Sequence, residues 1–218
     1  RCGHTDVDSK TGVCSTCEYQ LTAGISSAGT AKYFDNIDNA FTAALSAENN
    51  GCTLTLYKDC ELSQNIVIGN ATLTVDVNGH FISPEIRGID VNDGGVLYLK
   101  NSGENGSIGL EMAVNKGGTL INGTADDSSS AVSLFAVTAD AAECVEFYGG
   151  SCTYLTIKNG TSGIALYGGY YDIICGSLTD NTPVNDLLAK GYAFATLNSV
   201  THLPESIVDG SAKTIGDG

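Results

Sequence analysis

Short stretches of alternating apolar and polar residues recur along most of this chain, and each ends in Asn followed by Gly or a polar residue. The clearest is residues 71–80, and looser copies follow at 97–101, 119–123 and 155–160. Alternation with a period of two residues, bounded by turn-forming residues, is typical of β-strands joined by tight turns. The Asn residues that end the stretches are 23, 21 and 37 residues apart. Periods near twenty residues indicate the coils of a solenoid.

Twelve short segments between positions 52 and 178 are expected to form strands. In most of them the alternation assigns each side chain to a face; Leu97 and Leu99, for example, point one way and Tyr98 the other. The composition agrees, because 27 Gly and only 3 Pro accompany many β-branched residues. The expected strands are 52–57, 65–68, 72–77, 88–91, 96–100, 112–115, 119–121, 132–137, 144–148, 154–158, 164–167 and 171–175.

The Asn residues after these strands are expected at the corners of the coils. Asn101, Asn122 and Asn159 each lie two residues beyond an inward apolar side chain, so all three should point inward. An inward amide can bond the backbone of a neighbouring coil and so pair polar groups that a bend leaves without partners. Asn78 does not fit this register and is expected on the outer face, because the valines before it occupy the inward positions.

Residues 35–50 contain the one segment with a helical period, and Asp35 or Asn36 can cap its start. A helix placed before a run of strands can cover the open end of the first coil. A Ser/Gly/Ala-rich link is expected before it at 22–30, and a helical turn at 186–191 with a last strand at 192–197 should close the other end. The apolar stripe of the helix consists of Ile37, Ala40, Phe41, Ala44 and Leu45.

The first 22 residues form a separate unit with the pattern C-x-H-x9-C-x2-C, made by Cys2, His4, Cys14 and Cys17. Three thiols and an imidazole at this spacing are typical of a closed tetrahedral zinc site, so a structural zinc ion is expected here. Two disulfides are the alternative in a secreted protein, and a loose terminal segment is the third. The solenoid should then span 31–197, with an extension or linker at 198–218.

Charge limits the partners of the chain. With 10 Lys+Arg against 25 Asp+Glu the formal net charge is −15, which disfavours nucleic acid and anionic membrane surfaces. No apolar run is long enough to enter a membrane as a helix. Because Arg1 is not a natural start and no signal peptide is present, we expect a piece of a longer, secreted or surface-anchored protein that is monomeric within that chain.

Candidate chemistry is sparse. A polysaccharide lyase on this architecture needs a basic side chain beside a carboxylate cluster that holds Ca²⁺. The possible bases are Arg87, Lys100 and Lys116, and the possible ligands are Asp76, Asp90 and Asp93. No dense acidic patch surrounds them in the sequence, so isolated surface carboxylates are the expected outcome. Asp126 and Asp127 lie in a polar segment that is expected to be a loop rather than a glycosidase site.

Outward tyrosines are the main candidates for binding. Tyr98, Tyr148 and Tyr167 fall on the outer side of their strands, and Tyr170 and Tyr171 follow a Gly-Gly pair. Because strands of successive coils stack at about 4.8 Å, such rings could form an aromatic strip. A strip of this kind suits sugar rings or a protein partner. The alternative is that stacked tyrosines only stabilise the outer face of the sheet.

Five further cysteines lie outside the N-terminal unit. They are expected to be buried free thiols that fill apolar space, since pairs eight residues apart can bridge only if the chain turns between them. A disulfide between neighbouring coils is the alternative. The five are Cys52, Cys60, Cys144, Cys152 and Cys175.

Taken together, these features resemble the right-handed parallel β-helix of pectate-lyase-like proteins, and in particular of surface proteins of gut Firmicutes. The resemblance is carried by residues 34–40 followed by 52–59 and 73–80, by the glycine-bearing stretches 100–109 and 166–170, and by the Cys/His unit beside them. It implies the fold more strongly than an activity, because this architecture hosts lyases, hydrolases and adhesins alike.

The expected function follows from the resemblance and the tyrosines. We expect a non-catalytic, extracellular recognition or adhesin module of a bacterial surface protein, which binds a host glycoprotein, a glycan or an immunoglobulin. A carbohydrate-active enzyme, either a polysaccharide lyase using the region of Arg87, Asp90 and Asp93 or a glycoside hydrolase, is the first alternative. A rigid spacer between other domains is the second.

Overall fold

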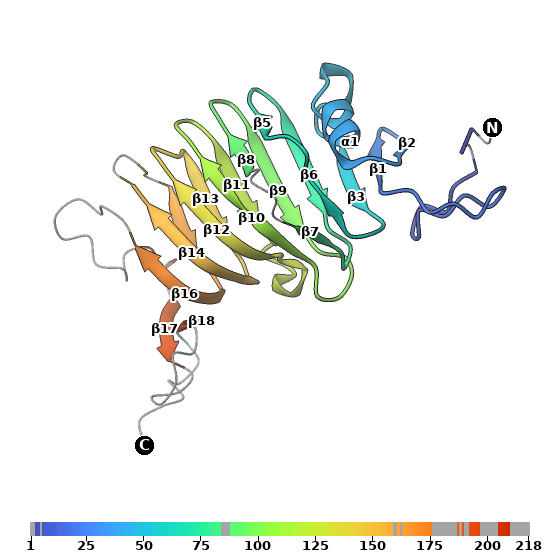
Figure 1. Ribbon diagram of the computed structural model, residues 1–218. Helices are drawn as coiled ribbons and strands as arrows, with labels where there is room; N and C mark the ends of the chain where they lie inside the picture. Colours follow the sequence, from blue (N-terminus) through green and yellow to red (C-terminus); the bar gives the residue numbers. More distant parts are fainter. Residues whose placement is uncertain are drawn as a thin grey trace.

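The chain folds into a stack of β-coils in the computed structural model, which describes residues 3–4, 6–83, 88–158, 161, 163–175, 187, 189, 192–196 and 205–209. Over these residues it forms a β-solenoid of about five turns with one α-helix. Corresponding strands of successive coils run parallel and lie side by side (Figure 1). The all-β class and the solenoid predicted from the alternating pattern are therefore confirmed.

One face of the solenoid takes a single strand from each coil. The strands pair in parallel and in register, so that Leu73 lies opposite Leu97 and Leu97 opposite Leu120. Equivalent positions therefore stack along the axis, inward on inward and outward on outward. We call this face the first sheet; its parallel strands are β3 (Thr53–Leu56), β6 (Thr72–Asp76), β9 (Val96–Lys100), β11 (Thr119–Asn122), β13 (Cys144–Phe147) and β15 (Ile164–Leu166).

We call the opposite face the second sheet, and the number of strands that each coil contributes to it changes along the axis. The first coils contribute two short strands each, β4 (Cys60–Glu61) with β5 (Ile66–Ile68), then β7 (Phe81–Ser83) with β8 (Gly88–Val91). Later coils contribute one long strand each: β10 (Ser107–Val114), β12 (Ser133–Ala139), β14 (Ser151–Ile157) and β16 (Gly169–Cys175). The two arrangements meet at β10, which pairs with β7 at its start and with β8 at its end. The sequence analysis missed β4, β7 and the first half of β10.

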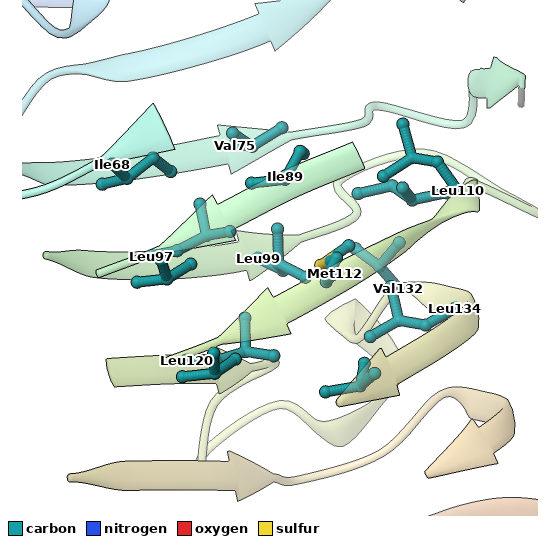
Figure 2. Packing of buried hydrophobic residues seen from close by; sticks show 14 of the residues in the cluster. Ile68, Val75, Ile89, Leu97, Leu99, Leu110, Met112, Leu120, Val132 and Leu134 are labelled. Carbon is teal, nitrogen blue, oxygen red and sulfur yellow. The ribbon is translucent and has the colours of Figure 1, made fainter. Parts of the chain in front are cut away.

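The inward side chains of all coils form one apolar core between the sheets (Figure 2). Val75, Leu97 and Met112 come from different strands and are each 0% exposed. Burial of apolar surface is the main favourable term in folding, and every coil adds to the same core. The alternating pattern of the sequence thus predicts which side chains of the solenoid face the core and which face solvent.

Inward Asn residues lie at one corner of the coils, as predicted. The Oδ1 atom of Asn101 accepts a hydrogen bond of 2.7 Å from the backbone N–H of Gly79 in the preceding coil. The amide of Asn122 binds both backbone groups of Val132, donating to its carbonyl and accepting from its N–H, each at 2.9 Å. The two side chains pair backbone groups at the bend, and Asn159 lies outside the described residues.

Asn78 is not on the outer face, where it was predicted to lie. Its side chain is half-buried and donates to the carbonyl of Leu56 in the preceding coil at 2.9 Å. The alternation stops just before it, because Asp76 and Val77 are both buried. Asn78 and Gly79 both have positive φ, 48° and 79°, within a turn closed by a bond from His80 N–H to the Val77 carbonyl. The bend therefore shifts the register by one position.

A second corner carries an Asn ladder that the sequence analysis did not identify. Asn115 donates from Nδ2 to Oδ1 of Asn92 at 2.8 Å, one coil away. Each Asn begins a four-residue turn, Asn-x-Gly-Gly, in which the first glycine has a φ of 68° at Gly94 and 73° at Gly117. A Cβ atom at the second glycine of the later turn, Gly118, would lie 2.3 Å from the Val91 carbonyl oxygen. Coils can therefore stack at this corner only with glycine there.

The helix is shorter than predicted. The α1 helix spans Ile37–Ala44 and is followed by the 3₁₀-helix η1 (Ala47–Asn49), where residues 35–50 were expected to form one helix. Asn36 caps it, as one of the two predicted caps, by accepting from Asn39 N–H at 3.0 Å. The apolar side of α1 joins the core of the coils, and its Asp38 carboxylate accepts from the Ser63 hydroxyl at 2.7 Å.

The predicted link at residues 22–30 is wrong. These residues belong to a β-hairpin of β1 (Ala23–Ser27) and β2 (Thr30–Phe34), and β1 pairs antiparallel with β3 in the first sheet. The two-residue turn consists of Ala28 and Gly29, with φ values of 47° and 81°. Positive φ at both central residues is the geometry that matches the twist of hairpin strands. Pairing with β3, rather than local apolar alternation, holds this Ser- and Gly-rich strand.

At the other end, the predicted strand at 192–197 is present as β17 (Tyr192–Thr196). It pairs antiparallel with β18 (Glu205–Asp209), which in turn pairs with β16. Most of the predicted helical turn at 186–191 lies outside the described residues. Within the described part of the chain, no helix is long and apolar enough to cross a membrane.

Cys52 and Cys152 are buried free thiols, as predicted, whereas Cys60 and Cys144 are free but only half-buried. The side chain of Cys175 lies outside the described residues. Burial raises the pKa of Cys60 and Cys152 to about 12 from an ordinary value of 9.0, with Asp59 contributing at Cys60, and burial likewise raises that of Tyr57 from 10.0 to about 12. These groups are therefore held in their neutral, protonated forms by the fold.

We expect the solenoid to lose stability above pH 9. A raised pKa in the folded state means full stability below the unfolded pKa and a loss as pH rises toward the folded value. This range is about 9 to 12 for the two thiols and about 10 to 12 for Tyr57. In that window each group costs about 1.4 kcal/mol per pH unit. Urea unfolding at pH 8 and pH 10.5 measures this loss. A Cys60→Val, Cys152→Val double variant should lose less between the two pH values, and an equal loss would contradict the assignment.

Candidate functional site

Two of the predicted tyrosines stack at the C-terminal half of the solenoid. The rings of Tyr148 and Tyr167 have centroids 4.5 Å apart and planes that differ by 3°. The register explains this contact, because Phe147 on β13 lies opposite Leu166 on β15, which places the next residue of each coil side by side. The chain repeats an apolar residue followed by Tyr-Gly-Gly at 147–150 and 166–169. The repeat was the sequence signal for this stack, and the sequence analysis did not use it.

A pocket of about 420 Å³ opens beside the stacked rings. A loop that includes the 3₁₀-helix η2 (Ser128–Ser130) forms one wall, and the two Gly-Gly pairs also line the pocket. A Cβ atom at Gly149 would lie 2.3 Å from the Ser128 carbonyl oxygen, so the loop packs directly on the glycine backbone. The lining residues are Thr124, Ala125, Ser128, Ser129, Tyr148, Gly149, Gly150, Tyr167, Gly168, Gly169 and Tyr170.

The Glu146 carboxylate lies next to the rings. The hydroxyl of Tyr148 donates to its Oε2 atom at 3.0 Å. Burial, together with this bond and the negative charge of Glu146, raises the pKa of Tyr148 well above its ordinary value. The phenol therefore keeps its proton at neutral pH and donates it to the carboxylate. Glu146 was not among the predicted site residues, because its place beside Tyr148 depends on where β13 ends.

The other predicted tyrosines lie in three different environments. Tyr170 is 46% exposed and lines the same pocket. Tyr98 is 39% exposed on the first sheet but lies opposite Ile121, in a different column from the stacked rings. The continuous strip that includes Tyr98 is therefore not formed.

Tyr171 is buried, contrary to its predicted place on the surface. It is 2% exposed because the register of β16 sets it opposite Cys152, an inward residue of β14. Its ring packs edge-on against Phe147 with centroids 5.7 Å apart, and its hydroxyl donates to the Gly168 carbonyl at 2.9 Å. Tyr171 thus supports the pocket from inside and does not face a ligand.

An exposed aromatic pair on the second sheet was also missed. Phe135 on β12 and Tyr154 on β14 are 48% and 41% exposed, and their rings meet edge to face with centroids 5.5 Å apart. Each lies where its strand has two consecutive outward residues, which breaks the alternation used to assign faces.

The N-terminal unit brings three of the four predicted metal ligands together. The ligand atoms of His4, Cys14 and Cys17 all lie within 4.8 Å of one another, and this group could hold a metal ion. Backbone bonds from Glu18 N–H to the Cys14 carbonyl and from Cys14 N–H to the Tyr19 carbonyl close the turn between the two cysteines. Cys2 lies outside the described residues.

The same unit packs against the first coil through Tyr57, which is 4% exposed. Gly12 lies so close that a Cβ atom there would be 2.3 Å from the Tyr57 ring, and a Cβ at Gly24 would be 2.8 Å from its hydroxyl. The Gln20 amide donates to the Tyr57 carbonyl at 2.7 Å. Lys58 adds a bond from Nζ to the Gln20 carbonyl at 3.3 Å. The ligand-bearing turn is therefore attached to the solenoid.

Among the residues considered for catalysis, the structure brings one candidate base and one candidate carboxylate together. The Lys100 Nζ atom lies 3.1 Å from Oδ2 of Asp76, which is 4% exposed at the corner that also holds Asn78 and Asn101. Asp90 is on β8, Asp93 is in the turn after it, and Arg87 lies outside the described residues. The described residues contain no group of three carboxylate, His or Cys ligands other than the one at the N-terminus.

Two further candidates, Lys116 and Asp127, lie elsewhere in the solenoid, and the histidine that ends residues 71–80 has a partner of its own. Lys116 is exposed in the turn after β10. The Asp127 carboxylate accepts from Ser129 N–H at 3.1 Å and caps η2. The Nδ1 atom of His80 lies 3.4 Å from Oδ1 of Asp59, at the same corner as Asn78.

Comparison of the chain with protein-family models, with curated proteins and with solved structures found no match.

Proposed function

We propose that this chain is a non-catalytic recognition module that binds a glycan in the pocket beside Tyr148 and Tyr167. The observation that carries the proposal is the stacked pair of rings at the edge of a pocket that is otherwise lined by glycine backbone and hydroxyl side chains. Small-ligand sites are concave, with apolar and aromatic walls and a few polar groups that fix orientation. This pocket has that composition.

The chemistry of a sugar ring fits the pocket. One face of a pyranose carries C–H bonds with a slight positive charge, and the face of an aromatic ring is slightly negative. The hydroxyls of the sugar find donors or acceptors in Thr124, Ser128 and Ser129, which line the pocket. The Glu146 carboxylate, bonded to the Tyr148 hydroxyl, lies beside them as a further acceptor. A pocket of about 420 Å³ has room for one or two sugar units rather than for a protein loop. Among the expected partners we therefore favour a glycan, free or on a host glycoprotein, over an immunoglobulin.

The setting of the proposal is the one implied by the family resemblance. The module belongs to a surface protein that meets its glycan outside the bacterial cell, and the coils are those of a right-handed parallel β-helix. In this proposal α1 caps the first coil, since Ile37, Ala40 and Phe41 close the end of the core. The carbohydrate-active enzyme stays an alternative prediction, which an assay for uronate cleavage with Ca²⁺ addresses.

We further propose that His4, Cys14 and Cys17, with Cys2, bind one structural zinc ion. Zinc lies about 2.3 Å from sulfur and 2.1 Å from nitrogen in tetrahedral sites, which places two such ligand atoms about 3.6 Å apart. The Cys17 sulfur and the Nδ1 atom of His4 are 3.5 Å apart. When bound, zinc would supply cross-linking of the turn that packs on Tyr57, and four protein ligands would leave no open position for catalysis.

Replacing Tyr167 with alanine should abolish most glycan binding. A central aromatic contact contributes about 2 kcal/mol or more, so the Kd should rise about 30-fold. A glycan array identifies a ligand, and calorimetry then compares the wild type with the variant. Tyr98→Ala is the matched control, because this ring is exposed on the same sheet and outside the pocket. Equal binding by Tyr167→Ala, or no glycan bound by the wild type, would refute the proposal.

A further inference from the structure

Among the described residues that line the pocket beside Tyr148 and Tyr167, none has a basic side chain. Its eleven lining residues are tyrosines, glycines, Ala125 and the hydroxyl residues of the η2 loop. A site that recognises a carboxylate or sulfate group in proteins supplies Arg, Lys or His, or the N–H groups at the start of a helix. These described lining residues therefore offer neutral donors and acceptors.

A negatively charged side chain is hydrogen-bonded to one of these rings. Glu146 accepts the Tyr148 hydroxyl at 3.0 Å and is half-buried. Its register neighbours on the outer face of the first sheet are Ile121 and Ala165, which carry no charge. The four ion pairs found among the described residues do not involve Glu146. The carboxylate is thus one hydrogen bond away from a ring that lines the pocket, and no basic side chain of the described residues forms an ion pair with it.

We propose that this site selects uncharged saccharides and rejects acidic ones, with Glu146 as the specificity-determining residue. The inference rests on the proposed function. The Glu146 carboxylate accepts hydrogen bonds from the hydroxyls of a neutral sugar that lies on the rings. A uronate, sialate or sulfate at the same place brings a second negative charge near the first, and like charges raise the free energy of the complex. The net charge of −15 adds a weaker, longer-range repulsion.

The test compares sugars that differ by one acidic group, using the full chain. Lactose with sialyllactose, and galactose oligomers with galacturonate oligomers, are suitable pairs. We expect the acidic member to bind about tenfold more weakly, which corresponds to about 1.4 kcal/mol. The difference should shrink at high salt, because salt screens charges near the surface. It should also shrink in Glu146→Gln, which keeps a hydrogen-bond acceptor for Tyr148, and should persist in the control Glu111→Gln on the second sheet.

The outcomes separate the two proposals. If acidic sugars bind as tightly as neutral ones or more tightly, and Tyr167→Ala weakens both, the selectivity is refuted while glycan recognition at this pocket stands. If Glu146→Gln leaves a clear preference for neutral sugars unchanged, Glu146 is not its source and the inference fails. If neither member of any pair binds, glycan recognition itself is refuted and the selectivity with it.

Discussion

Replacing Asn122 with alanine should lower the free energy of unfolding by about 2 to 6 kcal/mol. Asn122 is 0% exposed, and its amide pairs both the N–H and the carbonyl of Val132 at 2.9 Å. Truncation leaves these two backbone groups buried without partners, and each unpaired group costs about 1 to 3 kcal/mol. Urea unfolding followed by circular dichroism measures the change.

A neighbouring substitution serves as the control for Asn122. Ile121 precedes it on β11, and its half-buried side chain lies on the outer face. Ile121→Thr should therefore lower the free energy of unfolding much less than Asn122→Ala does. The corner also bears on function, since Val132 follows the η2 loop that walls the pocket. Equal stability of the two variants would show that the buried amide does not hold the bend.

Removing zinc should unfold the N-terminal unit and leave the coils intact. Metal binding in small Cys/His units contributes about 10 kcal/mol, because the unit has too little core to fold without it. We expect one zinc ion per chain by elemental analysis and none in Cys14→Ser. Chelation should raise hydrogen exchange over residues 6–21 and expose Tyr57, which packs on Gly12. Exchange in β9 and β11 should not change.

The zinc prediction has a matched control and a clear contrary result. Cys144→Ser removes a half-buried thiol of β13, far along the chain from the unit, and should keep the zinc. Zinc-free protein in which two of the three N-terminal cysteines form a disulfide would support the alternative prediction instead. In that case reduction, rather than chelation, would release the unit from Tyr57.

The features that the sequence predicted well are those set by local alternation. Leu97 and Leu99 are both buried and Tyr98 is exposed. In a strand with one face in the core, the alternation of apolar and polar residues in the sequence tells which side chains face the core and which face solvent. Asn101 and Asn122 were placed inward by the same rule. The rule fails where the chain bends, as at Asn78, since two consecutive inward residues shift every later position.

The features that the sequence did not predict depend on partners distant in the chain. The β1 strand has no apolar alternation, and its pairing with β3 is what makes it a strand. Tyr171 is inward only because β16 sets it opposite Cys152. The binding pocket needs both kinds of information, because Tyr148 and Tyr167 stack through register while the η2 loop arrives from the preceding coil. The alternating pattern of the sequence identifies the tyrosines as candidates, but it does not predict that they lie together at a pocket.

The most direct test of glycan recognition at this site is an NMR titration of protein labelled on the tyrosine rings with a neutral oligosaccharide. The signals of Tyr148, Tyr167 and Tyr170 should shift together and saturate, while those of Tyr98 and Tyr154 stay fixed. Shifts confined to Tyr98 or Tyr154, or no shift of any ring on addition of the sugar, would contradict the assignment of the pocket as the binding site.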